Sequence, residues 1–163
     1  MSMDGVGVTK ITVSEHVALV TFCRMPTDPS VMAGVFSDLA SAGINVDMNS
    51  QTAPQGRTVD LSFTIPSCDL LAVLDILNHF REAHPSVRPM MSNGNCKIQL
   101  YGDQMRELCG VAASVVSAVA QSGADLMLIT TSEVDISLLI PQACCMDCVH
   151  ALEKVFSVQA SYG

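Results

Sequence analysis

Residues 24–48 read RMPTDPSVMAGVFSDLASAGINVDM, and the pattern in this stretch decides the fold. Asp28 followed by Pro29 is a typical helix start, because the aspartate can cap the first backbone N–H groups and proline lacks an N–H where none is needed. Apolar residues then recur at helical spacing as far as Gly43, a residue type that commonly follows the end of a helix. The stretch therefore predicts a helix over 29–42 and a strand after it.

The strand expected over 44–50 carries two polar residues that face the same side. Asn45 and Asp47 are two positions apart, which places them on one face of a strand. The backbone N–H groups at the start of the preceding helix suit a ligand carboxylate, and a carboxylate such as that of Asp47 suits a ligand ammonium. Together these groups fit the main-chain end of a free amino acid. The alternative is that both side chains are ordinary polar residues satisfied by turns.

The composition predicts a well-packed chain and argues against two classes of partner. Of the 163 residues, 49% are hydrophobic, and the formal net charge is −8 with only 8 Lys and Arg, so a nucleic-acid surface is not expected. The most apolar window, 110–129, is interrupted by Gln121, Gly123 and Asp125, so no membrane span is expected. Seven cysteines without a secretory signal favour reduced thiols and a cytoplasmic protein.

The rest of the chain predicts further elements from alternating and helical hydrophobic patterns. Two junctions read as turns: Ser14-Glu15, and Asn93-Gly94, which is a strong hairpin signal. Ser67 is a candidate helix cap, followed by an apolar face of Leu70, Leu71, Val73, Leu74, Leu77 and Phe80. Strands are expected over 8–13, 16–23, 57–65, 86–91, 96–101, 126–130 and 135–140, and helices over 67–83, 110–122 and 143–156.

An internal repeat with a constant offset of 80 residues decides the architecture. Ser30-Val31-x-Ala33 matches Gly110-Val111-x-Ala113, and Ala42-Gly43 matches Ser122-Gly123. Each copy has the order β-α-β-β-α-β, which predicts an α+β fold of two ferredoxin-like sandwiches.

The number of strands also predicts how the two copies are connected. The second copy lacks its sixth element, which is its fourth strand, whereas the strand expected over 8–13 belongs to neither copy. We therefore expect this strand to complete the second sheet, so that the first unit is inserted into the second. The expected domains are 14–93 for the first, 6–13 with 94–158 for the second, and a tail over 159–163.

These motifs resemble the tandem ACT domains in the regulatory region of aspartate kinases. The resemblance runs from Val8 to Phe156 and rests on the loop 27–30, on the stretch 43–48, and most specifically on the run I-x-T-S-E-x-x-I-S over 129–137. This family also inserts its first ACT unit into its second. The resemblance implies binding of lysine, threonine or both at a subunit interface, a homodimer formed through ACT domains, and control of a kinase catalytic domain or subunit. It implies no cofactor.

The resemblance also implies the residues that hold the effector. In the first unit they are Thr27, Asp28, Ser30, Met32, Asn45, Val46, Asp47 and Gln51, and a possible second site has Gly110, Val111, Asp125, Leu126, Thr131 and Ser132. The chain departs from the family pattern at Thr27 and Ser30, where the family usually has Asp and Gly, and at Cys109, which replaces a proline.

Other functions remain open at this stage. The chain shows no Gly-rich phosphate loop for phosphoryl transfer, so catalysis by this chain alone is not expected. A free-standing ACT-domain amino-acid sensor and a structural dimerisation module are alternatives.

Two clusters of polar residues are weaker candidates for a site. Cys144-Cys145-x-x-Cys148 could suggest a metal or redox site, but it lacks a second ligand pair. Since Cys144 and Cys148 are one helical turn apart, we expect both to face the core and no metal site to form. Glu133 and Asp135 are expected to flank a solvated turn.

Overall fold

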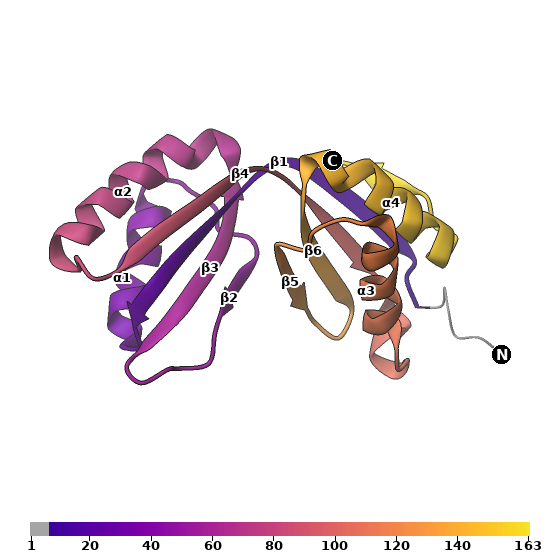
Figure 1. The fold of residues 1–163 in the computed structure, drawn as a ribbon, viewed down its shortest axis with the longest axis horizontal. Helices are drawn as coiled ribbons and strands as arrows, with labels where there is room; N and C mark the ends of the chain where they lie inside the picture. The colour runs from indigo at the N-terminus through magenta and orange to yellow at the C-terminus, as the bar shows by residue number, and fades with distance from the viewer. Residues whose placement is uncertain (1–6) are drawn as a thin grey trace. The chain divides into compact units, whose positions relative to one another are not determined.

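The structure, a computed structural model, describes residues 7–163. Val6, the first residue of the expected segment 6–13, lies outside the described residues. The elements are β1 (Lys10–Pro26), α1 (Pro29–Ser41), β2 (Asn49–Gln51), β3 (Thr58–Pro66), η1 (Ser67–Asp69), α2 (Leu70–Ala83), β4 (Arg88–Tyr101), η2 (Asp103–Glu107), α3 (Val111–Ser122), β5 (Leu128–Thr131), β6 (Asp135–Pro141), α4 (Gln142–Phe156) and β7 (Ala160–Tyr162) (Figure 1).

The chain divides into two compact units. One comprises His16–Asn93 and is called the inserted unit; the other comprises residues 7–15 together with Gly94–Gly163 and is called the split unit. β1 and β4 each contribute residues to both units. The predicted α+β architecture of two ferredoxin-like units, the first inserted into the second, is confirmed.

The inserted unit is a sheet in the order β2-β3-β1-β4, with α1 and α2 on one face (Figure 1). Alternate residues of β3 point to the helices, and the four that were predicted to be apolar on one side (Val59, Leu61, Phe63 and Ile65) are all buried. The rings of Phe22 and Phe63 lie 5.9 Å apart in this core. The alternation of β3 therefore predicted its buried face correctly.

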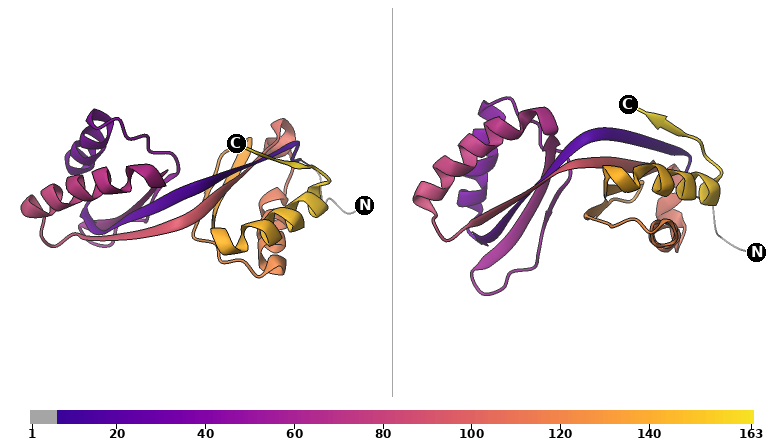
Figure 2. Two further views of the ribbon diagram at one scale, coloured as in Figure 1. Left: turned by 90° about the horizontal axis from the view of Figure 1, so that it is seen from above. Right: turned by 45° about the horizontal axis from the view of Figure 1, so that its top comes forward.

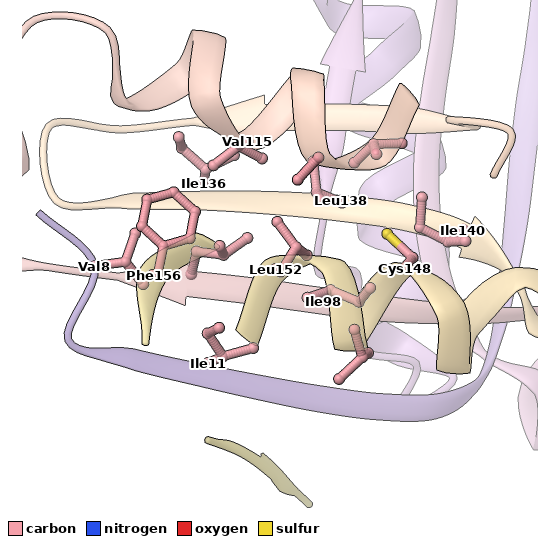
Figure 3. Close-up of a cluster of buried hydrophobic side chains, with 14 of the residues drawn as sticks. Val8, Ile11, Ile98, Val115, Ile136, Leu138, Ile140, Cys148, Leu152 and Phe156 are labelled. Carbon is pink, nitrogen blue, oxygen red and sulfur yellow. The ribbon is translucent and has the colours of Figure 1, made fainter. Parts of the chain in front are cut away.

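The split unit uses the first part of β1 as its fourth strand, as predicted. Its sheet has β1 beside β4, followed by β6 and β5, and the Thr9 N–H donates to the Tyr101 carbonyl at 2.8 Å. The core between this sheet and its helices is apolar and includes Ile98, Val115 and Leu152 (Figure 3).

The expected tail over 159–163 is instead part of this sheet. β7 pairs in parallel with β1, with Ile11 opposite Ala160 and Val13 opposite Tyr162 (Figure 2). The Gly163 N–H also donates to the Val13 carbonyl at 3.0 Å. The free edge of β1 explains the difference, because unpaired backbone groups of an edge strand favour one more strand.

Both predicted turns between strands are wrong. β1 continues through Ser14-Glu15, and β4 continues through Asn93-Gly94. The positive φ angles of His16 (59°) and Gly94 (74°) mark the places where the chain passes from one unit to the other. Because the residues on either side pair within different units, the strand runs on rather than folding back as a hairpin.

Smaller differences concern the ends of elements. The strand expected over 44–50 is regular only at Asn49–Gln51. The Ser67 hydroxyl does not cap α2 but donates to the Asn93 amide oxygen at 2.6 Å, and Leu71 is 78% exposed rather than buried. The described part of the chain contains no helix that is both long and apolar enough to cross a membrane.

Candidate functional site

The first predicted set of effector residues begins at the start of α1. Asp28 caps this helix, and its Oδ1 accepts the Ser30 N–H at 2.9 Å and the Ser30 hydroxyl at 2.8 Å. The backbone hydrogen bond from Ser30, reinforced by its hydroxyl, lowers the pKa of Asp28. The chain's own carboxylate therefore occupies the N-terminus of α1.

The rest of this set follows the C-terminal end of α1. Asn45 and Asp47 are exposed and alternate with the buried Ile44 and Met48, so the two polar residues share one side of the chain, as predicted. Gln51 is exposed in β2, whereas Met32 and Val46 are partly buried and pack against the core of the inserted unit.

The structure does not bring the two parts of the first set together within one chain. The Thr27 N–H bonds to the carbonyl of Arg57, and the Asp47 N–H bonds to the carbonyl of Thr64. From position 57 to position 64 the extended chain spans about 23 Å. The expectation that the helix start lies next to Asn45 and Asp47 is wrong, because α1 runs the length of the unit between them.

The second predicted set is arranged differently. Gly110, Val111, Thr131 and Ser132 line one cavity of about 370 Å³ in the split unit, called here the α3 cavity. Its other lining residues are Met105, Arg106, Leu108, Ala112, Glu133 and Ile136. Asp125 and Leu126 do not line it, because they follow the far end of α3, whose 12 residues extend about 18 Å.

The α3 cavity contains groups of both charges. Gly110 is the N-cap of α3 with a φ of 89° and makes no side-chain cap bond, so no side chain closes the first turn of this helix. Arg106 adds a guanidinium group and Glu133 a carboxylate. This combination suits a small zwitterion, whose carboxylate and ammonium each find a partner of opposite charge.

Ser132 has a structural part in this cavity. Its hydroxyl donates to Asp135 Oδ1 at 2.5 Å, and its oxygen accepts the N–H groups of Val134 and Asp135 at 3.2 and 3.1 Å. These bonds fix the turn between β5 and β6, which carries Glu133. Ser132 thus lines the cavity and also holds the turn that carries Glu133.

Arg106 and Glu133 were not among the predicted site residues. Arg106 lies in η2 and Glu133 in the β5–β6 turn, and their separation in the sequence hides the fact that they share a cavity. The signal that could have found Glu133 is its place in the run over 129–137, which carries the family resemblance, whereas Glu133 itself was expected to flank a solvated turn.

The cysteine cluster belongs to the core of the split unit. Cys148 is buried and Cys144 is partly buried and packs against the same core, so both face the core as expected, and Cys145 is buried there as well. Burial raises the pKa of Cys148 to about 11 and also raises that of Cys96, so these thiols stay protonated near neutral pH. Within residues 7–163, no group of three or more His, Cys, Asp and Glu side chains is placed to hold a metal ion.

Comparison with known proteins places this fold in a family. A family model for the ACT domain matches residues 98–156. The ligand-free regulatory subunit of aspartate kinase from Thermus thermophilus superimposes with a TM-score of 0.83 at 28% identity, covering 92% of this chain and 99% of that one. A structure of aspartokinase alpha and beta subunits gives 0.81 at 30% identity with the same coverage. The chain belongs to the ACT-domain family of aspartokinase regulatory modules.

This aspartokinase-type module corresponds to part of the longer relatives. The aspartokinase of Pseudomonas aeruginosa is 28% identical over 160 residues, which are 98% of this chain and 39% of that protein. The matched segment 98–156 includes all the lining residues of the α3 cavity and lies entirely in the split unit.

Proposed function

We propose that this ACT module binds a free amino acid in the α3 cavity and thereby controls an aspartate kinase catalytic domain or subunit. The observation that carries the proposal is the meeting of three features in one cavity: the uncapped N-terminus of α3, the guanidinium group of Arg106 and the carboxylate of Glu133. The ligand carboxylate would bind the helix N-terminus and Arg106, and its ammonium would bind Glu133.

The apolar part of the lining suggests how a side chain would be accommodated. Met105, Leu108 and Ile136 offer aliphatic surface beside the charged groups, and a volume of about 370 Å³ lies at the small end of the range for ligand pockets. We propose lysine or threonine as the effector. E. coli aspartokinase III, which shares the fold at 19% identity and a TM-score of 0.71, was crystallised in complex with lysine and aspartate.

The first set of residues supports a different kind of site. The Asp28 carboxylate already accepts the Ser30 N–H at the start of α1, so a ligand carboxylate there would have to displace Asp28 from Ser30. Since Thr27 and Asp47 lie at opposite ends of the inserted unit, we propose that any effector held by this set bridges two chains of a homodimer. β2 and β5 each pair on one side only in the described chain, which leaves edges for such an assembly.

Regulation would follow from a difference in affinity. An effector that binds one arrangement of the subunits more tightly than another shifts the population toward it, and only this difference can change the activity of a catalytic partner. The inhibition of a partner kinase by the effector should therefore disappear in every variant that no longer binds it.

Thermal unfolding with each of the twenty amino acids tests the proposal. An amino acid at about 100 times its dissociation constant should add about 2.7 kcal/mol of stability, an upward shift in Tm of several degrees. Titration calorimetry on Arg106→Gln and Glu133→Gln should show affinity reduced about ten- to hundredfold, because each loses one charge-assisted bond. Arg57→Gln is the matched control, since Arg57 is an exposed arginine of the inserted unit.

The same titration separates the two candidate sites. Loss of binding in Arg106→Gln but not in Asp47→Ala assigns the effector to the α3 cavity. The reverse result assigns it to the first set of residues. Absence of a shift with every amino acid would overturn amino-acid binding by this chain and favour the structural dimerisation module.

A further inference from the structure

A second cavity, in the inserted unit, is rich in arginine. It has a volume of about 610 Å³ and is lined by Cys23, Arg24, Arg81, Arg88, Pro89 and Met90, all of which belong to the inserted unit. None of these residues belongs to the α3 cavity or to the first set of effector residues. The cavity is called here the arginine cavity.

The charge in the arginine cavity is unusual for this chain. The sequence has a net charge of −8 and only five arginines, at positions 24, 57, 81, 88 and 106, and three of the five line this one cavity. Like charges that gather in one place repel each other unless an anion lies among them.

The described chain supplies little negative charge to this group. Within residues 7–163, no carboxylate forms an ion pair with Arg24, Arg81 or Arg88. Asp60 lies near, but its Oδ1 accepts the backbone N–H of Arg24, at 3.2 Å, rather than a guanidinium N–H. The three guanidinium groups are therefore available to a ligand.

The fold brings the three arginines together from three different elements. Arg24 lies near the end of β1, Arg81 in the last turn of α2, and Arg88 at the start of β4. The pairing between β1 and β3 shifts register between Phe22 and Met25, and Arg24 in this bulge has a φ of 63°. A bulge re-aims a side chain away from the regular alternation of its strand.

A purely structural role accounts for only one member of the group. Arg81 in the last turn of α2 interacts favourably with the negative end of the helix dipole. Arg24 and Arg88 are strand residues, so this explanation does not extend to them. Both are exposed, and burial of an aliphatic stem in the core does not explain them either.

We propose that the arginine cavity binds a phosphorylated small molecule. A single carboxylate has two oxygens and is satisfied by one guanidinium fork, whereas a phosphoryl group has more oxygens and more charge to share among several. Pro89 and Met90 provide apolar surface for the remainder of the ligand, and the volume lies within the range of small-molecule pockets. This site is independent of the proposed amino-acid site, which lies in the other unit.

Titration of the whole chain with pyrophosphate tests this proposal, with sodium chloride at matched ionic strength as the reference. Saturable binding is expected, and Arg81→Gln and Arg88→Gln should each weaken it by about tenfold or more, since each removes a charge-assisted contact. Arg57→Gln, which changes an exposed arginine of the same unit outside the cavity, should leave it unchanged. Circular dichroism confirms that each variant is folded.

Three results would overturn the proposal. Wild-type protein that shows no saturable pyrophosphate binding would remove the site. If Arg57→Gln weakened pyrophosphate binding as much as Arg88→Gln, the binding would reflect attraction to surface charge in general. Citrate binding as tightly as pyrophosphate would indicate a polycarboxylate site instead. An Arg106→Gln protein that loses amino-acid binding while keeping pyrophosphate binding would separate this proposal from the proposed function.

Discussion

Replacement of Gly102 by alanine should destabilise the split unit, because its backbone lies against another segment. Gly102 directly follows β4 and has a φ of −167°, a conformation that any residue can adopt. A Cβ atom built on it would overlap the carbonyl oxygen of Gly7 and would lie 3.3 Å from the Cα of Val8. Both contacts are with main-chain atoms, so a side-chain rotation cannot relieve them.

The cost can be worked out from what the displaced segment does. Val8 is 5% exposed and packs in the core of the split unit, and the Thr9 N–H bonds to the carbonyl of Tyr101 at 2.8 Å. Overpacking costs about 1–3 kcal/mol, and a weakened hydrogen bond adds about 1 kcal/mol. We therefore expect Gly102→Ala to lower the free energy of unfolding by about 3 kcal/mol.

Gly34 provides a matched control with the opposite sign. It lies inside α1, it is exposed, and a Cβ built on it meets nothing within 4 Å. Alanine there removes the flexibility that glycine gives the unfolded chain without adding a clash, so Gly34→Ala should stabilise the protein by about 0.5–1 kcal/mol.

Urea unfolding followed by circular dichroism measures both variants. A Gly102→Ala protein as stable as the wild type would refute the close approach between Gly102 and Gly7. Because η2 begins directly after Gly102 and carries Arg106, this variant should also weaken the amino-acid binding that we propose for the α3 cavity. Destabilisation by Gly34→Ala would contradict its place in the helix interior.

Other predictions test the cores, the helix cap and the thiols. Leu152→Ala should cost about 3 kcal/mol in urea unfolding because the side chain is fully buried, whereas Leu71→Ala should be nearly neutral because Leu71 is 78% exposed. The hydrogen bond from the Ser30 N–H lowers the pKa of Asp28 in the folded state. The stabilisation from this cap is therefore present above the pKa that Asp28 has in the unfolded chain, and it is lost as the pH falls through the lower folded value. Asp28→Ala should therefore be less stable than wild type near pH 7 and equally stable at low pH, while Asp28→Asn should keep a cap that does not depend on pH. Iodoacetamide near pH 8 should label the exposed Cys68 and spare Cys148, whose pKa burial raises to about 11, as read by mass spectrometry.

The sequence predicted the elements well where local pattern and tertiary packing agree. The apolar alternation of β3 and the cap and proline at the start of α1 gave the right structure, because each is determined by neighbours in the chain. Asn93-Gly94 failed for the opposite reason. Its local chemistry favours a hairpin, but β4 serves both units, and pairing with distant strands outweighs a turn preference of two residues.

The candidate site was harder to predict than the fold. The offset of 80 residues aligned Ser30, near the start of α1, with Gly110, directly before α3, but a repeat shows which residues correspond and not how far apart they lie. It could not show that Thr27 and Asp47 lie at opposite ends of α1. Nor could the repeat show that Arg106 and Glu133 share a cavity, because this depends on η2 and the β5–β6 turn lying at the same end of α3.

The two copies of the repeat differ at one point that bears on their chemistry. With the offset of 80, Asp28 corresponds to Leu108, so one copy carries a carboxylate directly before Pro29 of α1, whereas the other carries an apolar side chain three residues before Val111 of α3. In the inserted unit that carboxylate closes the first turn of α1, and in the split unit Leu108 lines a cavity beside a first turn that no side chain closes. A ligand carboxylate in the α3 cavity would therefore supply the bond that Asp28 supplies within the other copy. The two copies therefore share a fold but differ in this residue type. A side chain of the chain itself accepts an N–H at the start of α1, whereas at the start of α3 the proposed ligand would do so.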